Sequence, residues 1–359
     1  MLKKFGLFFW GLNLLTTIIL VLSCIAPKVS PETNFLMAFI GLGFPIIYLL
    51  NIGWLVFWLF VKRKYVWLPI IGFVIGLPNA GNYASYRFFK QVSGNQPNDI
   101  SILSYNVKLF DLYNWSNNVA SQQGIMNAIN KADVDVLCIQ EFYTENSPNF
   151  NTKKQLLSKY RYAYFQPTLS KENNKQWGIA TFSKYPIIKK EKISFDNAKH
   201  NLAISTLMVI KGDTVNVINV HFQSLHFGYG DYGNIGSPDF DVTNGLFSTV
   251  KKIKAGFAKR IPQAKQLASY IASSQYPVIL CGDFNDSPNS HTYQIIKEHL
   301  EDSFKKAGWG LKSTYSGKLP FLRIDYIMGT KAIHFKKHHV IEEGFSDHYP
   351  VYSTFTVAN

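Results

Sequence analysis

The chain has 359 residues, 47% of them hydrophobic, and carries a formal net charge of +14 at pH 7. This length allows about two domains, and this apolar content allows a sizeable core. The three cysteines, Cys24, Cys138 and Cys281, have no regular spacing, which argues against a disulfide framework and a zinc site, so we expect free thiols. The basic charge suits an anionic substrate or membrane surface, but proteins that bind neither are often basic too.

Apolar residues crowd near the N-terminus, in three stretches over residues 5–26, 35–61 and 65–78. A helix of roughly 20 apolar residues crosses a bilayer, because lipid cannot satisfy a bare backbone. The first two stretches reach that length. The third is shorter and contains Pro69, so it either extends to about Tyr86 or lies re-entrant.

These stretches predict an all-α membrane anchor over residues 1–92, with two to three transmembrane helices, followed by a polar linker over residues 93–99. Lys3 and Lys4 precede the first stretch and residues 62–64 are all basic, so two crossings leave both basic groups on the cytoplasmic side. A third crossing would place the rest of the chain outside the cytoplasm. Without it, the rest of the chain would be cytoplasmic.

Two other interpretations of the N-terminal stretches are weaker. The sequence VLSC at residues 21–24 resembles a lipoprotein cleavage site, but the second apolar stretch is too long for the core of a signal peptide. The stretches contain no acidic residue, which argues against a transporter or a channel.

Short β-branched runs alternate with helix-like segments from residue 100 onward. The predicted strands cover residues 100–107, 134–140, 177–183, 202–210, 214–222, 276–284, 323–328 and 349–357. The predicted helices cover residues 118–131, 151–159, 248–274 and 290–299. This order predicts one α/β domain over residues 100–359, with packed sheets and helices outside them. Residues 227–247 are rich in Gly, Asp, Asn and Tyr and predict a long loop.

Polar side chains stand where several of these strands end. They are Asn106, Glu141, His221, Asp283 with Asn285, Asp325, and Asp347 with His348. Sites in α/β sheets gather outside strand ends, so these side chains could share one cleft. Taken singly, each has an ordinary explanation: Asn106 could cap a turn, Glu141 could be a solvated strand end, and Gly282 could serve a tight turn. Their combination predicts a site.

The residue types indicate the chemistry. Carboxylate oxygens with an amide carbonyl suit a hard cation such as Mg²⁺ or Mn²⁺. Hydrolysis of a phosphate ester needs charge neutralisation, an activated water and a protonated group near the phosphoryl oxygens. A metal ion on Glu141 would supply the first, and Asp283 could take a proton from water. Asp325 could hold the imidazole of His348 in one tautomer and keep it cationic.

The segments SYNV, IQE, WGIATFSK, NVHFQS, GDFND, RIDYIM and SDHYP occur in this order over residues 100–356. Together they closely resemble the endonuclease/exonuclease/phosphatase superfamily, whose fold is DNase I-like. The resemblance implies a four-layer α/β sandwich with one active cleft. By position, it implies that Asn106 and Glu141 form the metal site with Asp347 next to it. The residues that it implies for catalysis are His221, Asp283, Asn285, Asp325 and His348.

The implied roles are specific. Asp283 and Asn285 match the pair that activates water and orients the phosphate, and His221 matches a phosphate-contacting imidazole. Asp325 matches the partner of the terminal His348. Lys108 departs from the family pattern, because some family nucleases have an Asp there, so a possible ligand of a second ion is missing.

We therefore predict a divalent-metal-dependent phosphoesterase, with Mg²⁺ or Mn²⁺ as cofactor, that hydrolyses a phosphodiester of nucleic acid or phospholipid, or a phosphomonoester. Its partners would be this substrate and, through residues 1–92, a lipid bilayer; no protein partner is predicted. Membrane-tethered bacterial members of the superfamily have a similar N-terminus. We accordingly expect a multi-pass protein of the bacterial inner membrane with an extracytoplasmic catalytic domain. The alternative is a catalytically silent, membrane-tethered binding module of the same fold.

Overall fold

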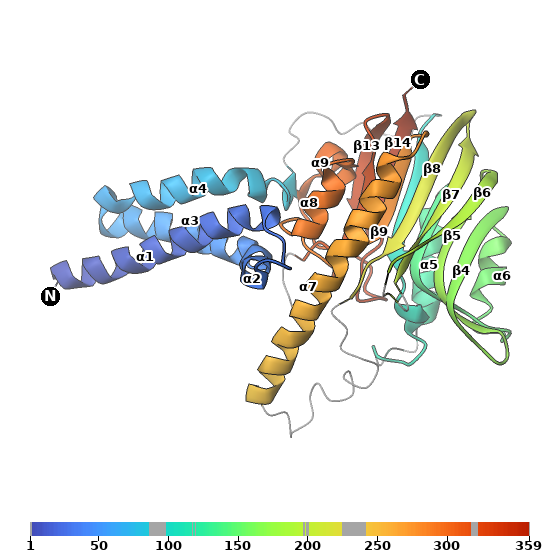
Figure 1. The fold of residues 1–359 in the computed structure, drawn as a ribbon, viewed down its shortest axis with the longest axis horizontal. Coiled ribbons are helices and arrows are strands. Elements are labelled where there is room, and N and C mark those ends of the chain that lie inside the picture. Colours follow the sequence, from blue (N-terminus) through green and yellow to red (C-terminus); the bar gives the residue numbers. More distant parts are fainter. Residues whose placement is uncertain are drawn as a thin grey trace. The chain divides into compact units, whose positions relative to one another are not determined.

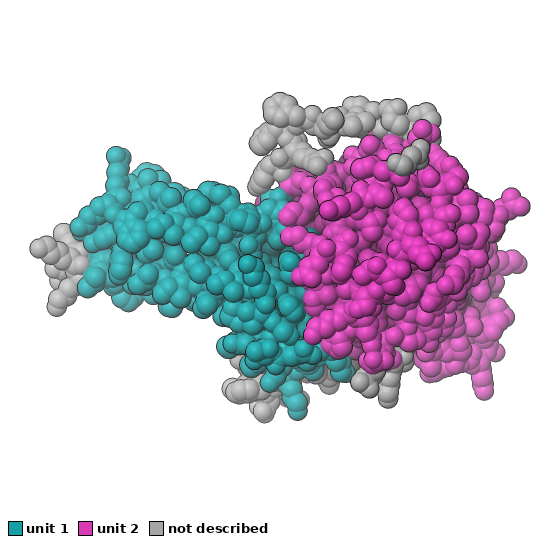
Figure 2. All heavy atoms as spheres, turned by 45° about the horizontal axis from the view of Figure 1, so that its top comes forward, with its two compact units in different colours: residues 1–84, 225–261, 286–294 teal, residues 85–224, 262–285, 295–359 magenta. Residues whose placement is uncertain are grey.

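The computed structural model describes residues 2–85, 98–116, 118, 120–196, 198, 201–224, 242–316 and 322–358. The chain divides into two compact units, coloured teal and magenta in Figure 2. The helical unit comprises residues 1–84, 225–261 and 286–294. The sheet unit comprises residues 85–224, 262–285 and 295–359.

Two six-stranded sheets form the sheet unit (Figure 1). The first contains, in order across the sheet, β10 (Glu301–Asp302), β12 (Asp325–Gly329), β9 (Val278–Asp283), β8 (Asp213–His221), β7 (Leu202–Ile210) and β6 (Ile187–Ser194). The second contains β13 (Ile333–Val340), β14 (Val351–Val357), β2 (Ile100–Asn106), β3 (Val136–Thr144), β5 (Lys175–Ser183) and β4 (Tyr162–Lys171). Each sheet has one parallel pair, β8 with β9 and β2 with β3, and is otherwise antiparallel.

The apolar core between the sheets takes side chains from both of them. Its members include Ile102, Val136, Cys138, Val217, Ile279 and Cys281. Successive side chains of a strand point to opposite faces, so Leu103 and Leu137 enter a second core, beneath α5 (Ser121–Ala132) and α6 (Thr152–Leu157). Burial on both faces explains why β2 and β3 are apolar almost throughout.

The outer face of the first sheet is covered by the part of α7 (Val242–Ala272) that belongs to the sheet unit, from Pro262 onward. Within the sheet unit, this helix buries Ala264, Leu267 and Ile271, and the Tyr270 hydroxyl donates to Glu191 of β6 at 3.1 Å. A short helix, α9 (Ser303–Ala307), lies against β12 and β13. Helix, sheet, sheet and helix follow one another, so the predicted four-layer α/β sandwich is confirmed.

The eight predicted strands are confirmed as β2, β3, β5, β7, β8, β9, β12 and β14, and the four predicted helices as α5, α6, α7 and α8 (His291–Lys297). The sequence did not predict β4, β6, β13 or α9, nor the two-residue strands β1 (Ala84–Ser85), β10 and β11 (Gly310–Leu311). Because α7 begins at Val242, the predicted loop is wrong over residues 242–247. Residues 225–241, and residues 86–97 with most of the predicted linker, lie outside the described part of the chain.

The N-terminal helices are α1 (Leu2–Ile25), α2 (Phe35–Leu42), α3 (Phe44–Val61) and α4 (Trp67–Ala80), with 3-10 turns η1 (Ala26–Lys28) and η2 (Arg63–Tyr65). Small residues let α3 and α4 approach closely: a Cβ on Gly72 would lie 2.6 Å from Asn51 Oδ1, and one on Gly76 would lie 2.4 Å from the Tyr48 ring. Asn51 also donates to the Pro69 carbonyl at 2.8 Å.

The second apolar stretch forms two helices rather than one. Gly43 ends α2, and Pro45 lies in the first turn of α3. Proline fits a first turn but not a helix interior, since it lacks an N–H and its ring conflicts with the preceding turn. Two segments, Gly6–Lys28 and Phe44–Val61, are long and apolar enough to cross a membrane. With 14 residues, α4 is shorter than the roughly 20 residues that a crossing needs.

Candidate active site

The centre of the site is Asp283, the last residue of β9. In the sheet register it lies opposite His221 of β8 on one side and Asp325 of β12 on the other. Gly282 has a φ of +152°, and a Cβ there would lie 2.0 Å from the Val220 carbonyl oxygen. Only glycine therefore lets β9 end so close to β8 with Asp283 at its tip.

The second sheet presents Asn106 and Glu141 at the ends of its parallel strands. Asn106 ends β2, opposite Gln140 of β3. Glu141 has a φ of +49° and lies in a register shift between Ile139 and Phe142. Such a bulge re-aims a side chain. Asn106 then joins the two sheets: its amide donates to Glu141 Oε1 at 3.3 Å and to Asp283 Oδ2 at 3.1 Å.

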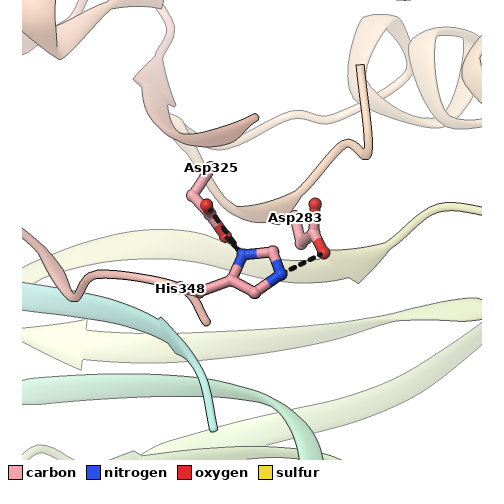
Figure 3. Close-up of side chains that lie close together, drawn as sticks. All are labelled: Asp283, Asp325 and His348. Atoms are coloured by element: carbon pink, nitrogen blue, oxygen red, sulfur yellow. Dashed lines mark hydrogen bonds and ion pairs between the residues drawn. The ribbon is translucent and has the colours of Figure 1, made fainter. Parts of the chain in front are cut away.

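The ring of His348 lies between two carboxylates (Figure 3). Its Nδ1 is 3.0 Å from Asp325 Oδ2, and its Nε2 is 3.8 Å from Asp283 Oδ2. Burial lowers the pKa of His348, but the negative charges of Asp325 and Asp283 outweigh burial and raise that pKa well above its usual value. The raised pKa favours the cationic form of His348, and Asp325 fixes the orientation of its ring.

Asp283 is only 1% exposed. Burial raises its pKa to about 7, although His348 and hydrogen bonds from Asn285 and Asn106 favour its ionised form. The backbone N–H of Asn285 donates to Asp283 Oδ1 at 2.7 Å, and its side-chain amide donates to Oδ2 at 3.0 Å. A carboxylate with a pKa near neutrality is suited to accept a proton from water.

His221 and Asp347 complete the set. His221 Nε2 lies 3.7 Å from both Glu141 Oε1 and Asp283 Oδ2. Asp347 Oδ2 lies 3.3 Å from the ammonium of Lys108. The hydroxyl of Ser346 donates to the Asn106 carbonyl at 2.9 Å, which connects the last loop to the end of β2.

The backbone after β2 turns with the left-handed conformation. Lys108, Leu109, Phe110 and Asp111 have φ angles of +46°, +54°, +56° and +55°. This conformation costs a residue with a side chain about 1 to 2 kcal/mol. Buried side chains of Leu109 and Phe110 and hydrogen bonds from Ser116 to Asp111 hold the turn. Backbone strain of this kind concentrates at functional sites.

A family model described as the endonuclease/exonuclease/phosphatase family matches residues 103–348. The chain belongs to this family. A second model, described as a domain of unknown function, matches residues 6–83.

Relatives of the chain are distant. The 3'-5'-exoribonuclease subunit Ccr4 of the CCR4-Not complex from Mycosarcoma maydis is 24% identical over 308 residues, 64% of this chain and 44% of the relative. The chain thus spans less than half the length of this curated relative.

Solved structures show the same fold. An endonuclease/exonuclease/phosphatase family protein from Bacteroides thetaiotaomicron has a TM-score of 0.53 at 17% identity, over 74% of this chain and 100% of that protein. The human Nocturnin catalytic domain with bound sulfate has a TM-score of 0.51 at 18% identity, over 74% of this chain and 97% of that domain.

The donor set of this family member fits a hard divalent cation at Glu141. Burial raises the pKa of Glu141, and the negative charge of Asp347 raises it further, so a cation there would relieve an unfavourable charge. Carboxylate and amide oxygens are the ligands that Mg²⁺ and Mn²⁺ prefer. Donor atoms of Asp283, Asp325 and His348 also lie within 4.8 Å of one another. A cationic imidazole has no free lone pair to bind a metal ion. We therefore interpret Asp283, Asp325 and His348 as residues for proton transfer and not as a second metal site.

All eight residues predicted from the sequence lie in the sheet unit. Seven of them are joined by the contacts described above, and Asp347 pairs with Lys108. The sequence did not predict the residues that support them. Gln140 donates to Asn219 Oδ1 at 2.6 Å beneath the site, and Thr314 accepts from the backbone N–H of Asp325 at 3.0 Å. Tyr315 meets the His348 ring edge-on at 5.4 Å. Nothing in the sequence distinguishes these from other buried polar or aromatic residues.

Proposed function

We propose that this chain is a divalent-metal-dependent phosphoesterase. The observation that carries the proposal is the position of Asp283 among Asn106, His221 and His348, where burial raises the pKa of its carboxyl to about 7. Family membership supports hydrolysis of a phosphate ester as the reaction class. A divalent ion beside Glu141 and Asn106, with Asp347 next to it, would neutralise charge on the substrate phosphate.

In the proposed reaction, ionised Asp283 takes a proton from water while the water oxygen bonds to phosphorus. The bond from phosphorus to the leaving oxygen breaks, and that oxygen keeps the electron pair and takes a proton from solvent. His348 donates from Nε2 to a phosphoryl oxygen and stabilises its growing negative charge. Asp325 keeps this imidazole oriented and charged. Asn285 and His221 orient the phosphate.

Nucleic acid is the first candidate substrate class. The curated relative is described as a 3'-5'-exoribonuclease, which supports a phosphodiester substrate. Phospholipid is the second candidate, because the helical unit exposes much apolar surface. Its exposed apolar side chains include Leu7, Phe8, Leu15, Ile18, Leu49, Leu50, Phe60, Ile70 and Val74. Apolar side chains facing outward over several helices are typical of contact with lipid.

We further propose that α1 and α3 cross a bacterial inner membrane. Both have the necessary length and hydropathy, and no acidic residue lies within them. We propose an extracytoplasmic catalytic domain, which requires a third crossing by α4. Because α4 has only 14 residues, this crossing would require local thinning of the bilayer. A protease-protection assay on inverted and right-side-out vesicles measures this directly. Protection of the sheet unit in inverted vesicles supports this orientation, and digestion there contradicts it.

The test of the reaction uses the full chain in detergent with Mg²⁺ or Mn²⁺. The panel contains RNA, DNA, phospholipids, sphingomyelin, inositol phosphates and bis-p-nitrophenyl phosphate. Asp283→Ala is the inactive variant, and Asp213→Ala, at the opposite end of β8, is the matched control. Cleavage that needs the metal and Asp283 but not Asp213 supports the proposal. A folded chain that binds a phosphate ester without cleaving it favours the silent binding module instead.

A further inference from the structure

The ammonium of Lys108 lies among the acidic residues of the site. Its Nζ is 3.3 Å from Asp347 Oδ2. Lys108 therefore already balances the negative charge of Asp347.

The backbone holds Lys108 in place. Its N–H donates to Asn106 Oδ1 at 3.0 Å, directly behind the site, and its ammonium also lies 5.6 Å from the centre of the Trp115 ring. Lys108 begins the left-handed turn, and the next two side chains, Leu109 and Phe110, are buried. A lysine whose ammonium only faces solvent needs none of these constraints. The turn therefore indicates that the ammonium of Lys108 is held in a fixed position for a function.

The side chain of Lys108 remains 23% exposed, and that of Asp347 27%. A ligand entering the site can therefore reach the ammonium, which a fully buried ion pair would not allow. An ammonium is a compact charge that binds phosphate from several directions. The ammonium of Lys108 is thus held in a fixed position and is still accessible to a phosphate that enters the site.

We propose that Lys108 is a further catalytic residue: its ammonium contacts a non-bridging phosphoryl oxygen and, by engaging Asp347, limits the site to one divalent ion. This inference rests on the proposed phosphoesterase function and extends it. The substrate phosphate is then bound by one metal ion, the imidazolium of His348 and the ammonium of Lys108.

The first experiment measures metal binding without substrate. Mn²⁺ is titrated into the full chain in detergent, and bound Mn²⁺ is measured by electron paramagnetic resonance. The Mn²⁺ that the Glu141→Gln variant still binds is subtracted as binding outside the site. We expect one site ion in the native chain, an affinity about tenfold tighter or more in Lys108→Met, and a second ion in Lys108→Asp. The control is Lys131→Met, which removes an ammonium from a surface ion pair with Glu343 and should change nothing. Native Mn²⁺ binding in both Lys108 variants would overturn the one-ion role.

The second experiment measures phosphate contact. With bis-p-nitrophenyl phosphate, Lys108→Met should lower kcat/KM about 10²- to 10³-fold, as loss of one group that stabilises a transition-state oxyanion does. Lys108→Arg should restore most of this loss, and inorganic phosphate should inhibit Lys108→Met more weakly than the native chain. A kcat/KM in Lys108→Met within about twofold of the native value would overturn the catalytic role.

The two experiments separate this inference from the proposed function. If the native chain cleaves no ester, yet Lys108→Met weakens phosphate binding and changes Mn²⁺ binding, hydrolysis is wrong and Lys108 remains the cation of an anion-binding site. If the native chain is active and Lys108→Met is equally active, hydrolysis stands and the role of Lys108 is wrong.

Discussion

At the scale of single residues, the charge on His348 depends on its neighbours. Burial alone would lower its pKa, and Asp325 makes the largest contribution in the opposite direction. A role that needs the imidazolium is fulfilled below the folded pKa and is lost as pH rises through it. Because the pKa is raised, the native chain should keep this role through neutral pH and lose it only on the alkaline side.

Asp325→Asn should therefore move the alkaline limb of the pH profile of kcat/KM to lower pH, since it removes that carboxylate charge and leaves the effect of burial. It should also reduce the maximal rate about 10²-fold or more, because a mispositioned imidazole is a poor catalyst. The control is Glu342→Gln, which changes a surface carboxylate paired with Lys312. An alkaline limb at the native position in Asp325→Asn would contradict the proposed role of this pair.

The residues of the site were predictable because each stands at the end of a strand that is apolar enough to recognise. Asn106, Asp283 and Asp325 are buried polar groups at such ends. The position of Lys108 was not predictable, because it depends on four consecutive left-handed residues that have ordinary side chains. Gly marks such backbone in a sequence. Without glycine, the packing of Leu109 and Phe110 and the hydrogen bonds from Ser116 to Asp111 hold the turn.

At the scale of elements, the strands that the sequence did not predict share one position in the fold. Among the described strands, β6 ends one sheet, and β4 and β13 are the two ends of the other. Edge strands are half solvated and often carry lysine or proline, which discourage pairing with other chains. Three lysines and a glutamate interrupt the apolar pattern of β6, and Pro167 lies in β4. Central strands, buried on both faces, lack such interruptions and were predicted.

The two sheets are fixed to each other beneath the site by Asn219 of β8. Its amide donates to the Ala180 carbonyl at 2.9 Å and the Ile139 carbonyl at 3.2 Å, and it accepts from Gln140 at 2.6 Å. These partners belong to β5 and β3 of the other sheet. A buried polar group that loses its partner costs about 1 to 3 kcal/mol.

Asn219→Ala should destabilise the chain by about 1 to 3 kcal/mol, because buried polar groups lose their partner. It should also lower kcat, because Glu141 and Asp283 come from different sheets and Asn219 fixes these sheets to each other. Asn216→Ala is the matched control on the same strand, since Asn216 bonds to Ser205 of the neighbouring strand β7 at 2.6 Å. Thermal unfolding and turnover in detergent measure both effects. Equal losses of kcat in the two variants would show that the link between the sheets does not position the site.

At the scale of the whole molecule, the segment 286–294 belongs to the helical unit although it directly follows Asn285, a proposed catalytic residue. Asn289, 1% exposed, donates to the carbonyls of Ser23 at 2.9 Å and Gly41 at 3.2 Å. Both carbonyls lie in the last turn of a helix, where intrahelical donors run out. The Gly41 carbonyl also accepts from the backbone N–H of the C-cap residue Gly43. Gly41 permits this contact, since a Cβ there would lie 2.9 Å from the Asn289 carbonyl oxygen.

Asn289→Ala should lower the unfolding free energy of the full chain in detergent by about 1 to 3 kcal/mol, because the carbonyls of Ser23 and Gly41 each lose a buried hydrogen bond. Thermal unfolding measures the effect. Thr16→Val is the matched control, since it removes one hydrogen bond between α1 and α3, from Trp54 Nε1 at 3.1 Å, without touching the segment. If Asn289→Ala unfolds no earlier than Thr16→Val, the segment adds little to the helical unit.

Removal of residues 1–97 would test whether the helices act beyond the proposed membrane attachment. The shortened chain keeps every proposed catalytic residue but removes the carbonyls that meet Asn289 and the Pro27 carbonyl, 2.7 Å from His291 Nδ1. It also removes Phe39, whose ring lies 5.6 Å from that of Phe257. We expect a lower melting temperature and a lower kcat on bis-p-nitrophenyl phosphate than for the full chain, because the segment after Asn285 loses its support. Equal kcat values would show that the helices serve only the proposed membrane attachment. A large loss of kcat in the shortened chain would show that the helices also support the catalytic residues.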